Sequence, residues 1–366
     1  MKAMKYVRIL TATFLLASVL MASFCSTVAQ MKGSEHPLKM NYAFSNPILT
    51  NPLLGTTQYV LKNGSSLKIA HKYNSGNDMW IMFDHAGANH LYGMKEWRLS
   101  PNANKDTNAD LARPSVILWP DISDWIGPYI VGANQNGNGK GQDFTGGNHN
   151  YDGGENSSTT GRTVRYKVWV DGKELQDGIV ATGNKIKIEV VNRIQGFNTK
   201  EQDGSGREIL QETVTYEVEG GKVQVHLDIL PLEEITIYRY YGLQSVNGAW
   251  NNEVRYYAGT TEVARSAGSK YSDSGTKSQH PDVDIYLVSS AVQDGSQHQL
   301  LVTLDRNYGF GQLHYLAEDQ PIVFTQDYGK SYFLQVYNKS AVLKKGGTAS
   351  WQGSYHFFST SDQEHD

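Results

Sequence analysis

The stretch between residues 146 and 162 carries side chains that together suit acid–base chemistry. It reads Gly146-Gly147-Asn148-His149-Asn150-Tyr151 with Arg162 further on, and so offers amides, an imidazole that titrates near neutral pH, a phenol and a permanent cation. β-Elimination at a uronic acid uses this whole set, because a carboxylate is neutralised, a base removes the C5 proton and an acid protonates the departing oxygen. We expect Arg162 and Asn148 to hold the carboxylate. His149 would then be the base and Tyr151 the acid.

A structural role for the same residues stays open. His149 and Tyr151 would then brace a glycine-rich loop by hydrogen bonds, and Arg162 would be a surface charge at the start of a strand. Histidine serves in both settings, so its presence alone does not decide between them.

The segment before this loop combines acidic and aromatic side chains, namely Trp119, Asp121, Asp124, Trp125 and Tyr129. Such a mixture is typical of a sugar subsite, where a ring face stacks on an aromatic side chain and carboxylates bind hydroxyl groups. We therefore expect these five residues to bind substrate. A structural turn with both tryptophans buried is the alternative, since tryptophan is highly buried on average.

Paired carboxylates would point to a different reaction. Glycosidases place two carboxyl groups about 5 to 10 Å apart across the scissile bond. The candidates for such a pair are Asp121, Asp124, Asp152, Glu155 and Glu212.

The polar side chains of residues 212–244 supply further candidates. If they line a cleft, Glu212, His226 and Tyr240 would contact substrate, whereas on an ordinary solvated face they would be inert.

A metal site has weaker support in the sequence. His85 and His90 lack further partners at the spacing of a zinc site. Asparagines 134, 136 and 138, or Asp282 and Asp284, offer oxygens for calcium, but neither group matches the twelve-residue calcium loop. We expect no cofactor, and calcium stays open.

Charge and the N-terminus restrict the classes of protein. Lys plus Arg number 33 and Asp plus Glu number 37, with no long run of one sign, so nucleic-acid binding through a basic face is unsupported. Lys2, Lys5 and Arg8 precede the apolar run 9–22, as in a signal peptide that would end at residue 29. We expect export to the periplasm or beyond, with Cys25 removed. Lipidation of Cys25 is the less favoured alternative, because Phe24 suits it poorly.

The rest of the chain predicts strands. Aromatic residues make up 11% of the sequence and there are 36 glycines, which fits short strands joined by tight turns. Alternating apolar and polar residues recur, most clearly in the hairpin 212–230 around Gly220-Gly221, and we expect the segment 233–241 to continue its meander. About fifteen such strands need two large packed sheets. We therefore predict an all-β protein, a single large antiparallel two-sheet β-sandwich over residues 30–366.

These features resemble the exported polysaccharide-degrading enzymes of Bacteroidetes-type bacteria. The resemblance rests on the signal peptide ending Ala29-Gln30, the meander 212–241 and the aromatic, asparagine-rich loops, and not on a diagnostic motif. The closest structural analogy is the large β-sandwich of several polysaccharide lyases and sugar mutarotases. The resemblance implies a glycan substrate cut by elimination or hydrolysis.

Three functions are therefore open, and each predicts a different geometry. A polysaccharide lyase, which we favour, requires His149, Tyr151 and Arg162 in one cleft. A glycoside hydrolase requires a pair of carboxylates across a groove. A non-catalytic glycan-binding protein requires only a platform of tryptophan and tyrosine rings.

Overall fold

The structure, a computed structural model, describes residues 57–104, 116–119, 124–138, 141–151, 158–201, 205–292 and 295–361. The predicted signal peptide, Asp121, Asp152 and Glu155 lie outside these ranges, and Trp119 is described only as part of a strand.

Strands make up most of the described chain, and the named strand pairs run antiparallel. These residues contain no α-helix, and the fully described 3-10 helices are η3 (Gly248–Trp250) and η4 (Gly309–Gln312). No helix of the described residues is long and apolar enough to cross a membrane. The predicted all-β antiparallel architecture is confirmed.

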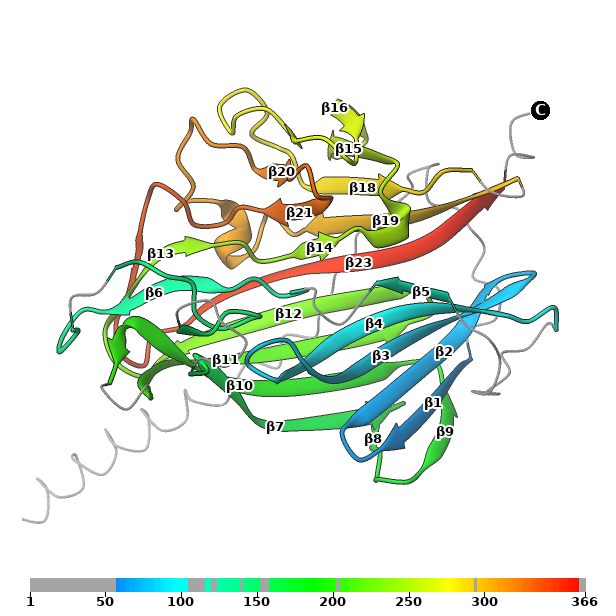
Figure 1. Cartoon of the computed structure of the whole chain (residues 1–366), viewed down its shortest axis with the longest axis horizontal. Helices are drawn as coiled ribbons and strands as arrows, with labels where there is room; N and C mark the ends of the chain where they lie inside the picture. Colours follow the sequence, from blue (N-terminus) through cyan, green and yellow to red (C-terminus); the bar gives the residue numbers. More distant parts are fainter. Residues whose placement is uncertain are drawn as a thin grey trace, which may run out of the picture. The chain divides into compact units, whose positions relative to one another are not determined.

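Ten strands form the largest sheet (Figure 1). In spatial order they are β16 (Thr261–Ala267), β15 (Glu253–Ala258), β18 (Ile285–Ser289), β19 (Ser296–Leu304), β23 (Ala349–Ser361), β12 (Lys222–Pro231), β11 (Gly206–Glu219), β10 (Ile186–Lys200), β7 (Gly161–Val170) and β8 (Lys173–Glu174).

Three smaller sheets face this large one. The first contains β5 (Val116–Trp119), β4 (Leu91–Pro101), β3 (Asn77–Ala86), β2 (Ser66–Asn74), β1 (Gln58–Asn63) and β9 (Val180–Gly183). The second contains β22 (Ala341–Leu343), β13 (Ile235–Tyr240) and β6 (Tyr129–Ala133). The third contains β14 (Gln244–Val246), β21 (Lys330–Phe333), β20 (Val323–Thr325) and β17 (Ser272–Asp273).

One continuous hydrophobic core lies between these layers. Phe83 of β3 packs edge-on against Tyr216 of β11, with ring centroids 5.2 Å apart. Tyr286 of β18 similarly meets Phe333 of β21 at 5.3 Å. Burial of each such ring stabilises the fold by about 1.5 to 3 kcal/mol. The layered arrangement is a β-sandwich, as predicted.

The predicted hairpin is confirmed, and β11 and β12 form it. Glu219 pairs with Lys222 across Gly220-Gly221, and Gly220 has a φ of 57°, which glycine adopts without strain.

The predicted continuation of the meander is wrong. β13 does not pair with β12, because the C-terminal strand β23 occupies that edge, pairing Leu227 with Trp351. β12 ends at Pro231, which has no backbone N–H for a ladder. The chain therefore leaves the large sheet, and β13 pairs with β6 and β22 in the facing layer.

Candidate functional site

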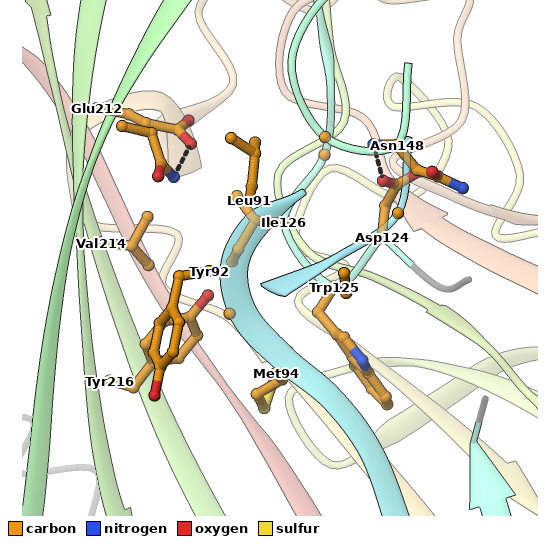
Figure 2. Close-up of a pocket in the computed structure, with 16 residues that line it drawn as sticks. Leu91, Tyr92, Met94, Asp124, Trp125, Ile126, Asn148, Glu212, Val214 and Tyr216 are labelled. Atoms are coloured by element: carbon orange, nitrogen blue, oxygen red, sulfur yellow. Dashed lines mark hydrogen bonds between the residues drawn. The ribbon is translucent and has the colours of Figure 1, made fainter. Parts of the chain in front are cut away.

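A pocket opens between the two layers, where the turn joining β3 and β4 meets β10 and β11. Its interior measures about 60 Å³. Figure 2 shows Glu212, Val214 and Tyr216 of β11 on one side, facing Asp124 and Asn148 on the other. A ligand pocket usually exceeds about 300 Å³, so this interior suits a carboxyl group or a few waters.

Glu212 and Asp124 are both buried carboxyl groups of the pocket, and Glu212 is the more buried, with 4% of its surface exposed. Its Oε2 accepts a hydrogen bond from the Tyr129 phenol at 2.9 Å, and its Oε1 accepts one from the Asn192 amide at 2.8 Å. Burial raises the pKa of Glu212, and the hydrogen bonds from Asn192 and Tyr129 oppose the rise. A carboxyl group with a raised pKa is suited to donate or exchange a proton near neutral pH.

Aromatic residues support Glu212 from behind. Tyr129 stacks on Tyr240 with ring centroids 4.5 Å apart, and the Tyr240 hydroxyl accepts a hydrogen bond from the Trp351 indole at 2.7 Å. Tyr240 points into the core because a β-bulge between Ile237 and Arg239 of β13 returns it to the face of Ile237. The network fixes the position of the carboxyl group.

Tyr92 lines the pocket from β4. Its ring stacks on Tyr166 at 3.8 Å between centroids, and its buried hydroxyl has no hydrogen-bond partner among the described residues. A buried hydroxyl group without a partner is unusual in a folded protein. Tyr92 can therefore offer a hydrogen bond to a ligand that enters the pocket.

Asp124 anchors the opposite wall and the loop 146–149. Its carboxylate accepts a hydrogen bond from the backbone N–H of Asn148 and forms an ion pair of 3.3 Å with Lys330 of β21. Gly147 allows this close approach, because its φ is +51° and a Cβ there would lie 2.9 Å from Oδ1 of Asp124.

His149 stands beside this ion pair, with its Nε2 3.8 Å from Oδ2 of Asp124. Its side chain is 40% exposed, so a ligand can reach it. Burial is the main cause that lowers the pKa of His149; Lys330 also lowers it, while Asp124 raises it. The imidazole is therefore neutral at pH 7 and able to accept a proton.

Aromatic and cationic side chains continue the surface beyond His149. The Phe144 ring lies 5.1 Å from that of His149 and 5.4 Å from that of Tyr241. Burial raises the pKa of Tyr241, which Arg239 opposes, so this phenol keeps its proton at neutral pH. Tyr241 in turn lies 5.0 Å from Tyr332.

The structure separates the four residues expected to be catalytic. Asn148 lines the pocket and His149 adjoins it through Asp124. Tyr151, however, is 3% exposed and donates its phenol proton to the Gly196 carbonyl at 2.8 Å. Arg162 is exposed on β7 and pairs with Glu208 at 2.5 Å. Neither residue lines the pocket, because each side chain is engaged by a neighbouring strand.

Of the residues expected to bind substrate, Asp124, Trp125 and Glu212 line the pocket, whereas Tyr129, Tyr240 and His226 do not. Trp125, Tyr129 and Tyr240 are buried and cannot present a ring face to a sugar. The register pairs His226 with Thr215, so it lies on the face of the large sheet opposite Glu212. His226 there contacts Asp228 at 3.2 Å. Glu212 and His226 therefore do not line one cleft together.

Two of the candidate metal ligands, His85 and Asp284, make hydrogen bonds within the protein. Among the described residues, no group of three or more His, Cys, Asp or Glu side chains gathers in a way that could hold a metal. His85 Nδ1 bonds to the His90 carbonyl at 2.7 Å, and Asp284 accepts a hydrogen bond from the Gly259 N–H at 2.8 Å.

Lys330, Arg239 and Tyr241 were missed as site candidates. Lys330 is remote in sequence from Asp124, and only the fold brings them together. Glu212 did carry a usable signal, since it occupies the apolar phase of β11 together with Val214 and Tyr216.

Comparison with known proteins gives only distant structural likenesses. No family model and no curated protein matches the sequence. A GH36 α-galactosidase from Geobacillus stearothermophilus, solved with raffinose, aligns over 83% of this chain and 41% of its own, with 9% identity and a TM-score of 0.39. An α-galactosidase from Lactobacillus brevis aligns over 83% and 39%, with 10% identity and a TM-score of 0.38. The chain thus spans about two fifths of these enzymes.

A galactose 1-epimerase from Lactobacillus acidophilus aligns over 83% of this chain and 98% of its own, with 8% identity and a TM-score of 0.33. Similarity of this degree says nothing about the activity of this chain.

Proposed function

We propose that the chain is a carbohydrate-active enzyme, a polysaccharide lyase that cleaves a uronate-containing glycan by β-elimination with His149 as the base. The observation that supports this most directly is the neutral, accessible imidazole 3.8 Å from the buried Asp124 carboxylate at the pocket. The predicted signal peptide would deliver the enzyme outside the cytoplasm, where such polymers occur.

The base role follows from the two charges next to His149. Asp124 stabilises the imidazolium that forms when the C5 proton is taken, as an oriented carboxylate does beside other catalytic histidines. Burial lowers the pKa of His149, and Lys330, which binds the same carboxylate, adds to this effect, so the imidazole is neutral before the reaction. The pair therefore holds His149 ready to accept a proton.

The remaining roles pass to residues near His149. Lys330, which pairs with Asp124, would neutralise the uronate carboxylate in place of Arg162, and the Asn148 side-chain amide at the pocket would donate a hydrogen bond to it. Tyr241, whose phenol stays protonated, would protonate the departing oxygen in place of Tyr151.

Hydrolysis is a second candidate, because the pocket brings together two carboxyl groups, Asp124 and Glu212. Glu212, with its raised pKa, would be the acid and Asp124 the nucleophile or base. A non-catalytic binding protein is less well supported, since three of the rings expected to form a stacking platform are buried.

The test measures ultraviolet absorbance of an unsaturated uronate product while the purified protein acts on a panel of uronate-containing polysaccharides. His149→Ala should abolish the rise, and His314→Ala, an exposed histidine elsewhere, should not. Reducing ends without that absorbance would reject elimination, and their loss in Glu212→Gln would support hydrolysis.

A further inference from the structure

Arg239 lies in an aromatic setting on the outer face of β13. Its guanidinium carbon is 4.2 Å from the centroid of the Tyr337 ring and 6.0 Å from that of Phe144. The β-bulge that turns Tyr240 into the core leaves Arg239 on the partly exposed side. Stacking on a ring holds a guanidinium flat, and the N–H groups of Arg239 that do not bond to the Tyr241 hydroxyl stay available at its edge.

Arg239 differs from most arginines of the protein in its charge partners. Among the described residues it forms no ion pair with a carboxylate, whereas the following arginines each form one: Arg98, Arg162, Arg165, Arg207, Arg255 and Arg265. A planar guanidinium without a carboxylate partner matches a carboxylate ligand in two parallel hydrogen bonds.

A cavity of about 290 Å³ opens beside Arg239. Tyr238, Tyr337, Gln142 and Asn338 line it with Arg239. Tyr238 is 37% exposed and offers a ring to a sugar, while the two amides can bond to sugar hydroxyl groups. The volume is close to the lower limit of ordinary small-ligand pockets, about 300 Å³.

The Phe144 side chain links His149 to Arg239, which lines the cavity. The Phe144 ring contacts both His149, at 5.1 Å between centroids, and Arg239, at 6.0 Å from its guanidinium carbon. A polymer whose sugar is placed at His149 would therefore reach Arg239 with a neighbouring sugar.

We propose that Arg239 and this cavity form a second subsite, which binds the carboxylate of a uronate next to the one that reacts at His149. This inference rests on the proposed function, since it takes the substrate to be a polymer with charged sugars in succession. The enzyme would then favour runs of uronate over glycans with isolated uronates.

The test is calorimetric binding of tetrasaccharides of galacturonate, of guluronate and of glucuronate-containing glycan, with carboxyl-reduced versions as neutral probes. Arg239→Gln should weaken binding of the best acidic probe about 10-fold to 100-fold and leave neutral probes unaffected. Arg239→Lys should bind the acidic probe more tightly than Arg239→Gln but less tightly than the parent, because lysine cannot form two parallel hydrogen bonds to a carboxylate. Arg165→Gln, an exposed and paired arginine, is the matched control.

Binding is measured separately from cleavage, so the two proposals can fail independently. If the parent cleaves by elimination and Arg239→Gln binds the acidic tetrasaccharides as tightly as the parent, the subsite is rejected and the lyase proposal stands. Arg239-dependent binding without cleavage would keep the subsite and reject the lyase. Preferential binding of a sulfated tetrasaccharide without uronates over all uronate probes would reject a carboxylate as the ligand of Arg239. The absence of binding by any probe would reject it as well.

Discussion

The phenol of Tyr129 donates a hydrogen bond of 2.9 Å to the carboxyl group of Glu212 in the interior of the protein. The Asn192 amide makes a second hydrogen bond to the same group. Both favour the charged form, yet burial outweighs them and the pKa of Glu212 is raised. The fold therefore retains a carboxyl group that destabilises it once ionised, as is common where a group serves a function.

Glu212→Gln should stabilise the protein at neutral pH. The pKa of Glu212 in the folded state is above its ordinary value of 4.5, so its contribution favours the folded state below that value and is lost as pH rises through the folded pKa. The neutral amide avoids this loss. We expect the variant to melt higher at pH 7.5, by about 2 to 4 °C for each kcal/mol recovered.

Thermal unfolding across pH 4 to 8 checks this. The difference between variant and parent should shrink toward the acid end. A gain that is equal at every pH would show that the carboxyl group is not the cause.

Substitutions at the ion pair should move the pKa of His149 in opposite directions. Asp124→Asn removes the charge that raises it, so the pKa should fall further. Lys330→Met removes a charge that lowers it, so the pKa should rise. NMR titration of the imidazole checks both, with His149→Asn assigning the resonance. Shifts of the same sign in the two variants would mean that these charges do not act on His149 as the contacts indicate.

The strands were more predictable than the site for a physical reason. Apolar and polar residues alternate along β11 and β12, which indicates that one face is buried, and two glycines mark the turn between them. The hairpin can therefore be predicted from residues that are neighbours in sequence. The β-bulge that buries Tyr240 leaves no such pattern. The pairing of β23 with β12 depends on contacts between residues that are far apart in sequence.

The same reason explains Tyr151 and Arg162. Both residues are close to His149 in sequence, which suggested that they are close to it in space. In the structure the Tyr151 phenol instead bonds to the Gly196 carbonyl, and the Arg162 guanidinium pairs with Glu208. Lys330 and Arg239 reach the site from other strands, which a single sequence does not reveal.

Tyr151→Phe should affect stability more than activity. The substitution removes one hydrogen bond to the buried Gly196 carbonyl, which still accepts one from the Thr199 hydroxyl at 3.0 Å, so the free energy of unfolding should fall by about 0.5 to 1.5 kcal/mol. If Tyr151 were the catalytic acid, the turnover rate would fall about 10²-fold to 10⁴-fold instead. Denaturant unfolding and the rate per folded enzyme, measured together, separate the two roles.

Gly147→Ala should impair activity through the position of the loop. A methyl group there would lie 2.9 Å from Oδ1 of Asp124 and would push apart the contact between Asp124 and the Asn148 N–H. Because a displacement of about 1 Å at a catalytic group can slow a reaction about 100-fold, we expect a loss of tenfold or more in elimination rate.

Gly178→Ala is the matched control for this loop. Gly178 also has a positive φ, of +71°, but a Cβ there would meet nothing within 4 Å. The two variants thus share a similar backbone strain of roughly 1 kcal/mol and differ in the contact with Asp124. Equal losses of activity would point to general destabilisation. Full activity in Gly147→Ala would show that the spacing between Asp124 and Asn148 does not govern the reaction.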